Sequence, residues 1–92
     1  MNIQNFTNGK GRPIRNQFII FDSDATYFQS YNSIIVKTCF EDGKRKVYLD
    51  ERYWDYSRTT GKYRNLFLGE TKKDTEKKIK SGEYTLVDLN SK

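Results

Sequence analysis

The alternation of apolar and polar positions predicts short strands in the first half of the chain. Gln17–Phe21 is an apolar run rich in β-branched and aromatic residues, and the three residues 22–24 close it as a turn. Thr26–Ser30 is a second extended stretch of the same kind. Both runs have the length and composition of strands in a small sheet.

A β-hairpin is the clearest local feature of the sequence. Ile34–Phe40 and Lys46–Asp50 flank the dipeptide Asp42-Gly43, which suits the two positive-φ positions of a type I′ turn. With this dipeptide as the turn, Glu41 faces Lys44, and the pairing continues to Val36 opposite Leu49. The register then puts two sets of residues on opposite faces, namely Val36, Thr38, Val47 and Leu49 on one and Lys37, Cys39, Lys46 and Tyr48 on the other.

The pattern changes to a helical period after residue 56. Thr59 or Thr60 can cap a first helix, in which Tyr63, Leu66 and Phe67 share one apolar stripe. Gly69 supplies the C-terminal stop of this helix.

A second helix is predicted directly afterwards. Thr71 and Asp74 have the spacing of a capping box, the helix runs to Lys80, and Gly82 provides a left-handed exit. Residues 84–89 alternate again and predict a final strand.

These elements predict one α+β domain, since 92 residues leave no room for two cores. We expect a small antiparallel sheet of about four to five strands, with the Asp-Gly hairpin at its centre and two short helices on one face. The domain spans residues 17–92. Residues 1–16 combine glycine and proline with little apolar content, and we expect a flexible basic arm there.

Composition excludes several kinds of chemistry. The chain has no histidine and one cysteine, Cys39, which rules out the usual zinc sites, an intrachain disulfide and nucleophiles activated by histidine. A nucleophile would need lysine or a carboxylate as its base, and no spacing singles out such a pair. We therefore predict no enzyme, no metal and no cofactor. The chain lacks a run of 18 apolar residues, so we predict no membrane span and a cytoplasmic location.

Charge is the feature that points to a partner. The net charge is +5, with no acidic residue in 1–16 and eight cations against three acids in 57–82. Such local excess attracts nucleic acid or an acidic protein surface, although lysine-rich helices can also be merely solvated.

The candidate binding residues cluster in the helical half. The predicted contacts are basic or aromatic, namely Trp54, Arg58, Lys62, Tyr63, Arg64, Lys72, Lys73, Lys77 and Lys78. The hydroxyls of Ser57, Thr59 and Thr60 can hold a phosphate or cap the helix. The aromatic rings can stack on bases or pack onto the sheet.

Several stretches of the sequence resemble a known family. They are Tyr27–Ile35, Val47–Leu49, the segment 54–63 with its pattern Ser57-x-Thr59-Thr60-x-Lys62, and Phe67–Gly69. Together they resemble short proteins of unknown function that bacteriophages and conjugative elements carry. The resemblance implies an accessory gene of a mobile element, and several classes of such genes disarm host defences such as CRISPR–Cas nucleases.

Three functional hypotheses follow. The first is a non-enzymatic, anti-CRISPR-like inhibitor that engages a host defence protein or nucleoprotein through its basic helical half. The alternative is an accessory protein that binds the nucleic acid backbone without sequence specificity. A third is an enzyme that pairs Lys62 with a nearby hydroxyl. An exposed sheet edge also allows a homodimer.

Overall fold

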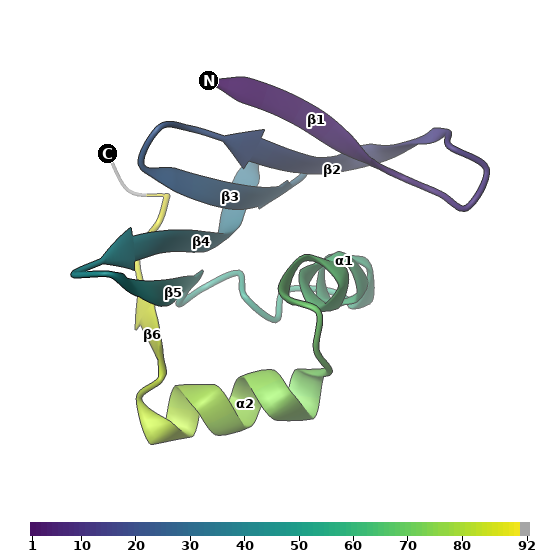
Figure 1. The fold of residues 1–92 in the computed structure, drawn as a ribbon. Helices are drawn as coiled ribbons and strands as arrows, with labels where there is room; N and C mark the ends of the chain where they lie inside the picture. Colours follow the sequence, from purple (N-terminus) through teal and green to yellow (C-terminus); the bar gives the residue numbers. More distant parts are fainter. Residues whose placement is uncertain (91–92) are drawn as a thin grey trace.

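The fold is a six-stranded sheet with two helices inserted before the last strand (Figure 1). The structure is a computed structural model and describes residues 1–90. Its elements, in chain order, are β1 (Asn2–Thr7), β2 (Pro13–Phe21), β3 (Ala25–Ser30), β4 (Ser33–Glu41), β5 (Lys44–Asp50), α1 (Arg58–Leu68), α2 (Lys72–Ser81) and β6 (Tyr84–Val87).

The sheet is mixed and follows the chain order β1-β2-β3-β4-β5-β6. Strands β1 to β5 form an antiparallel meander, whereas β6 pairs with β5 in parallel, with Val47 opposite Tyr84. The predicted antiparallel sheet of four to five strands therefore differs from the structure in two respects, since the sheet has six strands and its last pair is parallel. A parallel neighbour needs a long crossover connection, and the two helices between β5 and β6 supply it.

The N-terminal segment differs most from its prediction as a flexible arm. Residues 2–7 form β1, and β2 begins at Pro13 rather than at Gln17. The glycines between the two strands make a turn, which Asn8 closes by accepting hydrogen bonds from the backbone N–H groups of Lys10 and Arg12 at 2.8 and 3.0 Å. The glycines and the proline that suggested a flexible arm therefore belong to the turn of a β-hairpin and the start of its second strand.

Phe6 fastens this first hairpin to the core. Its ring lies edge-on to the ring of Phe28 on β3, with centroids 5.6 Å apart, and 5.4 Å from the ring of Tyr63 on α1. A single aromatic side chain in β1 thus contacts both the sheet and a helix.

The central hairpin is confirmed in detail. Asp42 and Gly43 have φ values of 54° and 78°, as a type I′ turn requires. Glu41 pairs with Lys44, and Val36 pairs with Leu49, in the predicted register.

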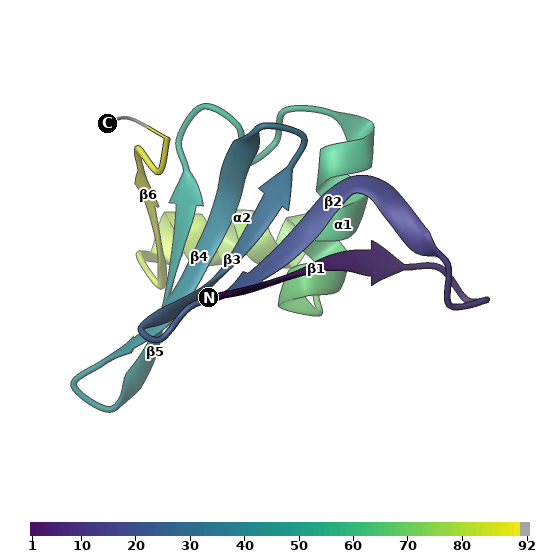
Figure 2. The same ribbon diagram turned by 90° about the horizontal axis from the view of Figure 1, so that it is seen from above.

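The core lies between the sheet and the two helices, which Figures 1 and 2 show on the same face. Its buried members are Phe28, Ile35, Val36, Val47, Leu49, Tyr63 and Tyr84. Ile35 and Val36 are adjacent and are both buried because the register of β3 and β4 shifts by one residue at this point. Simple alternation cannot predict such a bulge.

Both helices end at left-handed glycines, Gly69 and Gly82, as predicted. Helix α2 begins with the predicted capping box of Thr71 and Asp74. Helix α1 is capped by Ser57 instead of Thr59 or Thr60. Neither helix in residues 1–90 is long and apolar enough to cross a membrane.

Candidate functional site

An open groove of about 1000 Å³ is lined by the loop before α1, by α1 itself and by residues up to the first residue of α2. Its α1 wall carries Arg58, Lys62 and Leu66, its far end is formed by residues 69–72, and Asp55 closes it on the loop side. Leu66, predicted for the buried stripe, is 61% exposed in this wall. The groove therefore combines an apolar surface with cationic side chains.

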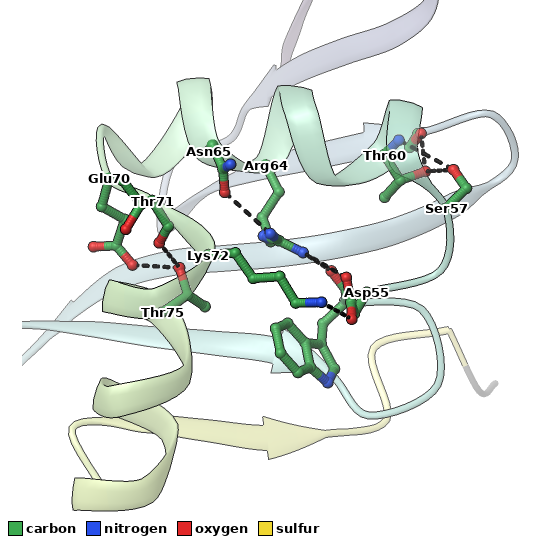
Figure 3. Close-up of polar contacts among 11 residues, drawn as sticks. Asp55, Ser57, Thr60, Arg64, Asn65, Glu70, Thr71, Lys72 and Thr75 are labelled. Atoms are coloured by element: carbon green, nitrogen blue, oxygen red, sulfur yellow. Dashed lines mark hydrogen bonds and ion pairs between the residues drawn. The ribbon is translucent and has the colours of Figure 1, made fainter.

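Arg64 lines this groove and is buried, and Figure 3 shows its guanidinium between the side chains of Asn65 and Asp55. Its Nη1 donates to the main-chain carbonyl of Trp54 at 2.6 Å, and its Nη2 donates to the Asn65 side chain at 3.0 Å. The carboxylate of Asp55 is 3.5 Å from Nη1. The guanidinium also lies over the Trp54 indole, 5.3 Å from the ring centroid. These contacts fix the loop before α1 onto the helix.

The prediction of Arg64 as a surface contact is therefore corrected. With 1% of its surface exposed, its side chain cannot reach a partner's phosphate. The prediction of Tyr63 as a binding residue is corrected likewise, because its side chain is buried in the core. Trp54 is half-buried and packs against the core, which leaves only part of its ring for a partner.

Two lysines of α2 are held in ion pairs within the chain. Lys72 Nζ lies 2.8 Å from the second carboxylate oxygen of Asp55, so Asp55 joins α2 to the Arg64 cluster (Figure 3). The hydrogen bond to Asp55 and the charge of its carboxylate raise the pKa of Lys72. Lys78 Nζ lies 2.7 Å from Glu70.

Glu70 is the polar centre of the corner between the helices. It accepts hydrogen bonds from the Thr75 hydroxyl at 2.5 Å, from Lys78 at 2.7 Å and from the Tyr84 hydroxyl at 2.8 Å. Burial alone would raise the pKa of Glu70, but these three bonds outweigh it and lower the pKa. Burial and the same carboxylate raise the pKa of Tyr84. The cluster ties α2 and β6 to the end of the groove.

Four of the predicted cations are exposed and form no ion pair with the described residues. Arg58 and Lys62 lie on α1 and line the groove, and the Lys62 ammonium lies 5.4 Å from the centroid of the Tyr63 ring. Lys73 and Lys77 are one turn apart on α2. The groove therefore presents two cations, Arg58 and Lys62, that form no ion pair with any carboxylate of residues 1–90.

The three hydroxyl residues of the Ser-x-Thr-Thr pattern have different environments. Ser57 Oγ accepts the Thr60 backbone N–H at 3.1 Å and donates to the Thr60 hydroxyl at 3.2 Å. Thr60 is buried, and its hydroxyl lies 2.9 Å from that of Ser30 on β3. Thr59 is exposed. Capping and core polar contacts account for Ser57 and Thr60, while Thr59 remains available to solvent.

A second pocket, of about 590 Å³, adjoins the groove at the start of α1. Ser57 lines both cavities. The pocket is built from the turn between β3 and β4, with Tyr31, and from the loop after β5, with Tyr53 and Tyr56. Tyr31 is 47% and Tyr56 65% exposed, and the rings of Tyr53 and Tyr56 lie 5.6 Å apart. None of the described residues that line it is charged.

The family of the chain is shown by a match over most of its length. The family model described as "Family of unknown function (DUF8033)" matches residues 1–83. This chain belongs to that family. Neither the curated proteins nor the solved structures gave a match. The DUF8033 match spans β1 to α2, so the groove and the tyrosine pocket both lie within it.

Sequence reasoning missed several residues of both cavities. Asp55 pairs with Arg64 and Lys72, and Glu70 pairs with Lys78. No periodic spacing in the sequence predicts these contacts. Tyr31 and Tyr56 line one pocket because the β3–β4 turn and the loop after β5 both contribute to it. Within residues 1–90, no three Cys, Asp or Glu side chains are grouped to hold a metal ion.

Proposed function

We propose that this DUF8033 protein is a non-enzymatic accessory protein of a mobile genetic element, and that it inhibits a host defence nucleoprotein in the manner of an anti-CRISPR protein. The contact is the groove on α1. The observation that carries the proposal is that Arg58 and Lys62 stand exposed in its wall with no carboxylate partner among the described residues.

Electrostatics and apolar area both support this contact. The groove presents Arg58 and Lys62 beside the exposed Leu66, so an acidic partner gains charge complementarity and buried apolar surface together. The buried Arg64 makes the groove rigid, because its hydrogen bonds hold the loop before α1 and the helix in one arrangement. A preformed groove lowers the entropy lost on binding.

The side chains of the site favour binding over catalysis. The hydroxyls of Ser57 and Thr60 are engaged in the helix cap, and Lys72 and Lys78 are engaged by carboxylates. The sequence contains no histidine to serve as a general base.

The setting rests on the resemblance to short proteins of bacteriophages and conjugative elements. Such a protein would meet its target in the cytoplasm of the host bacterium. Because the net charge is +5, the contact would differ from that of acidic DNA mimics. A basic groove suits the guide or target nucleic acid of the complex, or an acidic patch on its protein.

The test combines recovery of the partner with an assay of its activity. The tagged wild type, the double variant Arg58→Glu/Lys62→Glu and a control double variant Lys44→Glu/Lys46→Glu on the β4–β5 hairpin are used with host lysate. We expect wild type and control to retrieve the same nucleic-acid-bound nuclease and to inhibit its cleavage when added in excess. The groove variant should do neither. Absence of inhibition by the wild type, or full inhibition by the groove variant, contradicts the proposal.

A further inference from the structure

The basic groove and the tyrosine pocket meet at one residue. Ser57 lines both, Arg58 lies on the groove side, and Thr59 lies on the pocket side. A ligand that enters both cavities must therefore carry negative charge along one part and flat, uncharged groups along another.

We propose that this ligand is single-stranded nucleic acid, with its phosphates beside Arg58 and Lys62 and a base in the tyrosine pocket. The inference rests on the proposed function, since the strand would belong to the nucleoprotein that the protein inhibits. The inference identifies the part of that nucleoprotein that the protein contacts as its single-stranded nucleic acid.

The pocket has the properties of a base-stacking site. Tyr31 and Tyr56 are both exposed residues, and Tyr53 contacts the Tyr56 ring edge-on. Stacking on aromatic rings tolerates any base, because every base offers a π-face. The hydroxyls of Ser33 and Thr59 line the same pocket and can form hydrogen bonds to base edges without adding charge.

The groove provides the complementary electrostatic part. Arg58 and Lys62, which form no ion pair within residues 1–90, lie on one face of α1, one helical turn apart, so both can contact one backbone. A cationic track beside aromatic platforms is the arrangement by which single strands are bound without sequence preference.

Duplex nucleic acid and acidic protein fit these features less well. In a duplex the bases are stacked on one another, so the tyrosine rings would have no face to contact. An acidic peptide satisfies the cations but makes no use of the neighbouring uncharged aromatic pocket. Each is a distinct outcome of the test.

The test is fluorescence anisotropy with labelled oligonucleotides at low salt. The probes are oligo(dT), oligo(rU) and a mixed-sequence DNA duplex, each of about 12 nucleotides or base pairs, within the usual site size of small single-strand binders. We expect the wild type to bind a single strand more tightly than the duplex. Whichever of oligo(dT) and oligo(rU) binds more tightly then identifies the strand as DNA or RNA.

The decisive variant is Tyr56→Ala, with Tyr56→Phe to restore the ring and Phe40→Ala as the matched control. Phe40 is 75% exposed on β4 and lines neither cavity. Loss of one stacked base should weaken single-strand binding about 5- to 150-fold. The Phe variant and the Phe40 control should bind like wild type. Circular dichroism melting confirms that all of the variants fold.

Three results overturn the inference. They are no binding of either single strand at low salt, equal binding of duplex and single strand, and unchanged affinity in the Tyr56→Ala variant. If the host nuclease is still inhibited although neither single strand binds, the proposed function stands with an acidic protein as the contact. If it is still inhibited in the other two cases, the proposed function stands with the nucleic acid backbone as the contact, without base stacking. If single strands bind but no nuclease is inhibited, the proposed function fails and this inference survives.

Discussion

The Arg64 guanidinium donates a hydrogen bond of 2.6 Å to the main-chain carbonyl of Trp54. This contact makes Arg64, in the basic helical half of the chain, a structural residue. A cation that the sequence assigned to a binding surface instead joins a loop to a helix, and it leaves Arg58 and Lys62 as the groove's unpaired charges among the described residues.

Removal of Arg64 should therefore affect stability. Arg64→Ala leaves the Trp54 carbonyl and the Asn65 side chain without their donor and opens space beside the groove. We expect a loss of about 1–3 kcal/mol in the free energy of unfolding, because these acceptors lose their hydrogen-bond donor. Arg64→Lys should also destabilise, because an ammonium cannot reproduce the planar fork. Urea denaturation provides the measurement, with Arg58→Ala as the exposed control. A variant lacking Arg64 that is as stable as the control contradicts this role.

The Ser-x-Thr-Thr pattern should separate into two structural residues and one exposed residue. Ser57→Ala removes the cap of α1 and should cost about 1 kcal/mol. Thr60→Val leaves the buried Ser30 hydroxyl without its partner and should cost about 1–2 kcal/mol. Thr59→Ala is the matched exposed control and should leave thermal unfolding unchanged. Equal losses in all three variants would show that the cap has been misassigned.

Glu70 should give the protein a specific sensitivity to acid. Its pKa in the folded protein lies below its ordinary value of 4.5, so the carboxylate stabilises the fold fully above pH 4.5. This contribution is lost as the pH falls through the lower, folded pKa. Glu70→Gln should therefore destabilise by about 1–3 kcal/mol at neutral pH and progressively less below pH 4.5. The comparison uses denaturant unfolding across the pH range, with Glu76→Gln on the surface of α2 as control. A constant difference in stability between wild type and Glu70→Gln across this range would contradict a lowered pKa of Glu70 in the folded protein.

The first strand should contribute to stability, contrary to the expectation of a flexible arm. Phe6→Ala removes a partly buried ring that contacts both Phe28 and Tyr63. We expect a loss of about 2 kcal/mol, below the usual range for fully buried phenylalanine. Phe40→Ala, which removes an exposed ring, should change little. Hydrogen exchange of the β1 amides as fast as in an unfolded peptide would argue that the segment is mobile after all.

Local signals predicted the elements that local interactions determine. Asp42-Gly43 set the turn and register of the central hairpin, and Thr71 with Asp74 set the start of α2, because each depends on residues within one turn of the chain. The parallel placement of β6 depends on the path of two helices, and the burial of Arg64 depends on the loop that folds over it. Patterns along the sequence do not carry that information.

The site was predicted in part for the same reason. Arg58 and Lys62 are exposed because they lie on the face of α1 opposite Thr60 and Arg64, and helical spacing predicts this. The tyrosine pocket brings Tyr31 together with Tyr53 and Tyr56, which are its neighbours only in three dimensions. Composition pointed to aromatic and basic residues, and the fold determined which of them share a surface.

The salt dependence of oligonucleotide binding tests the central claim, that the cations of the α1 groove contact phosphates, most directly. Each phosphate contacted on a single strand contributes a slope of about −0.7 in a plot of log affinity against log salt concentration. We predict that Arg58→Ala and Lys62→Ala each make the slope shallower by about 0.7, whereas Lys44→Ala, in the β4–β5 turn, leaves it unchanged. A flat salt response of the wild type, or the same slope in all three variants, would contradict the account.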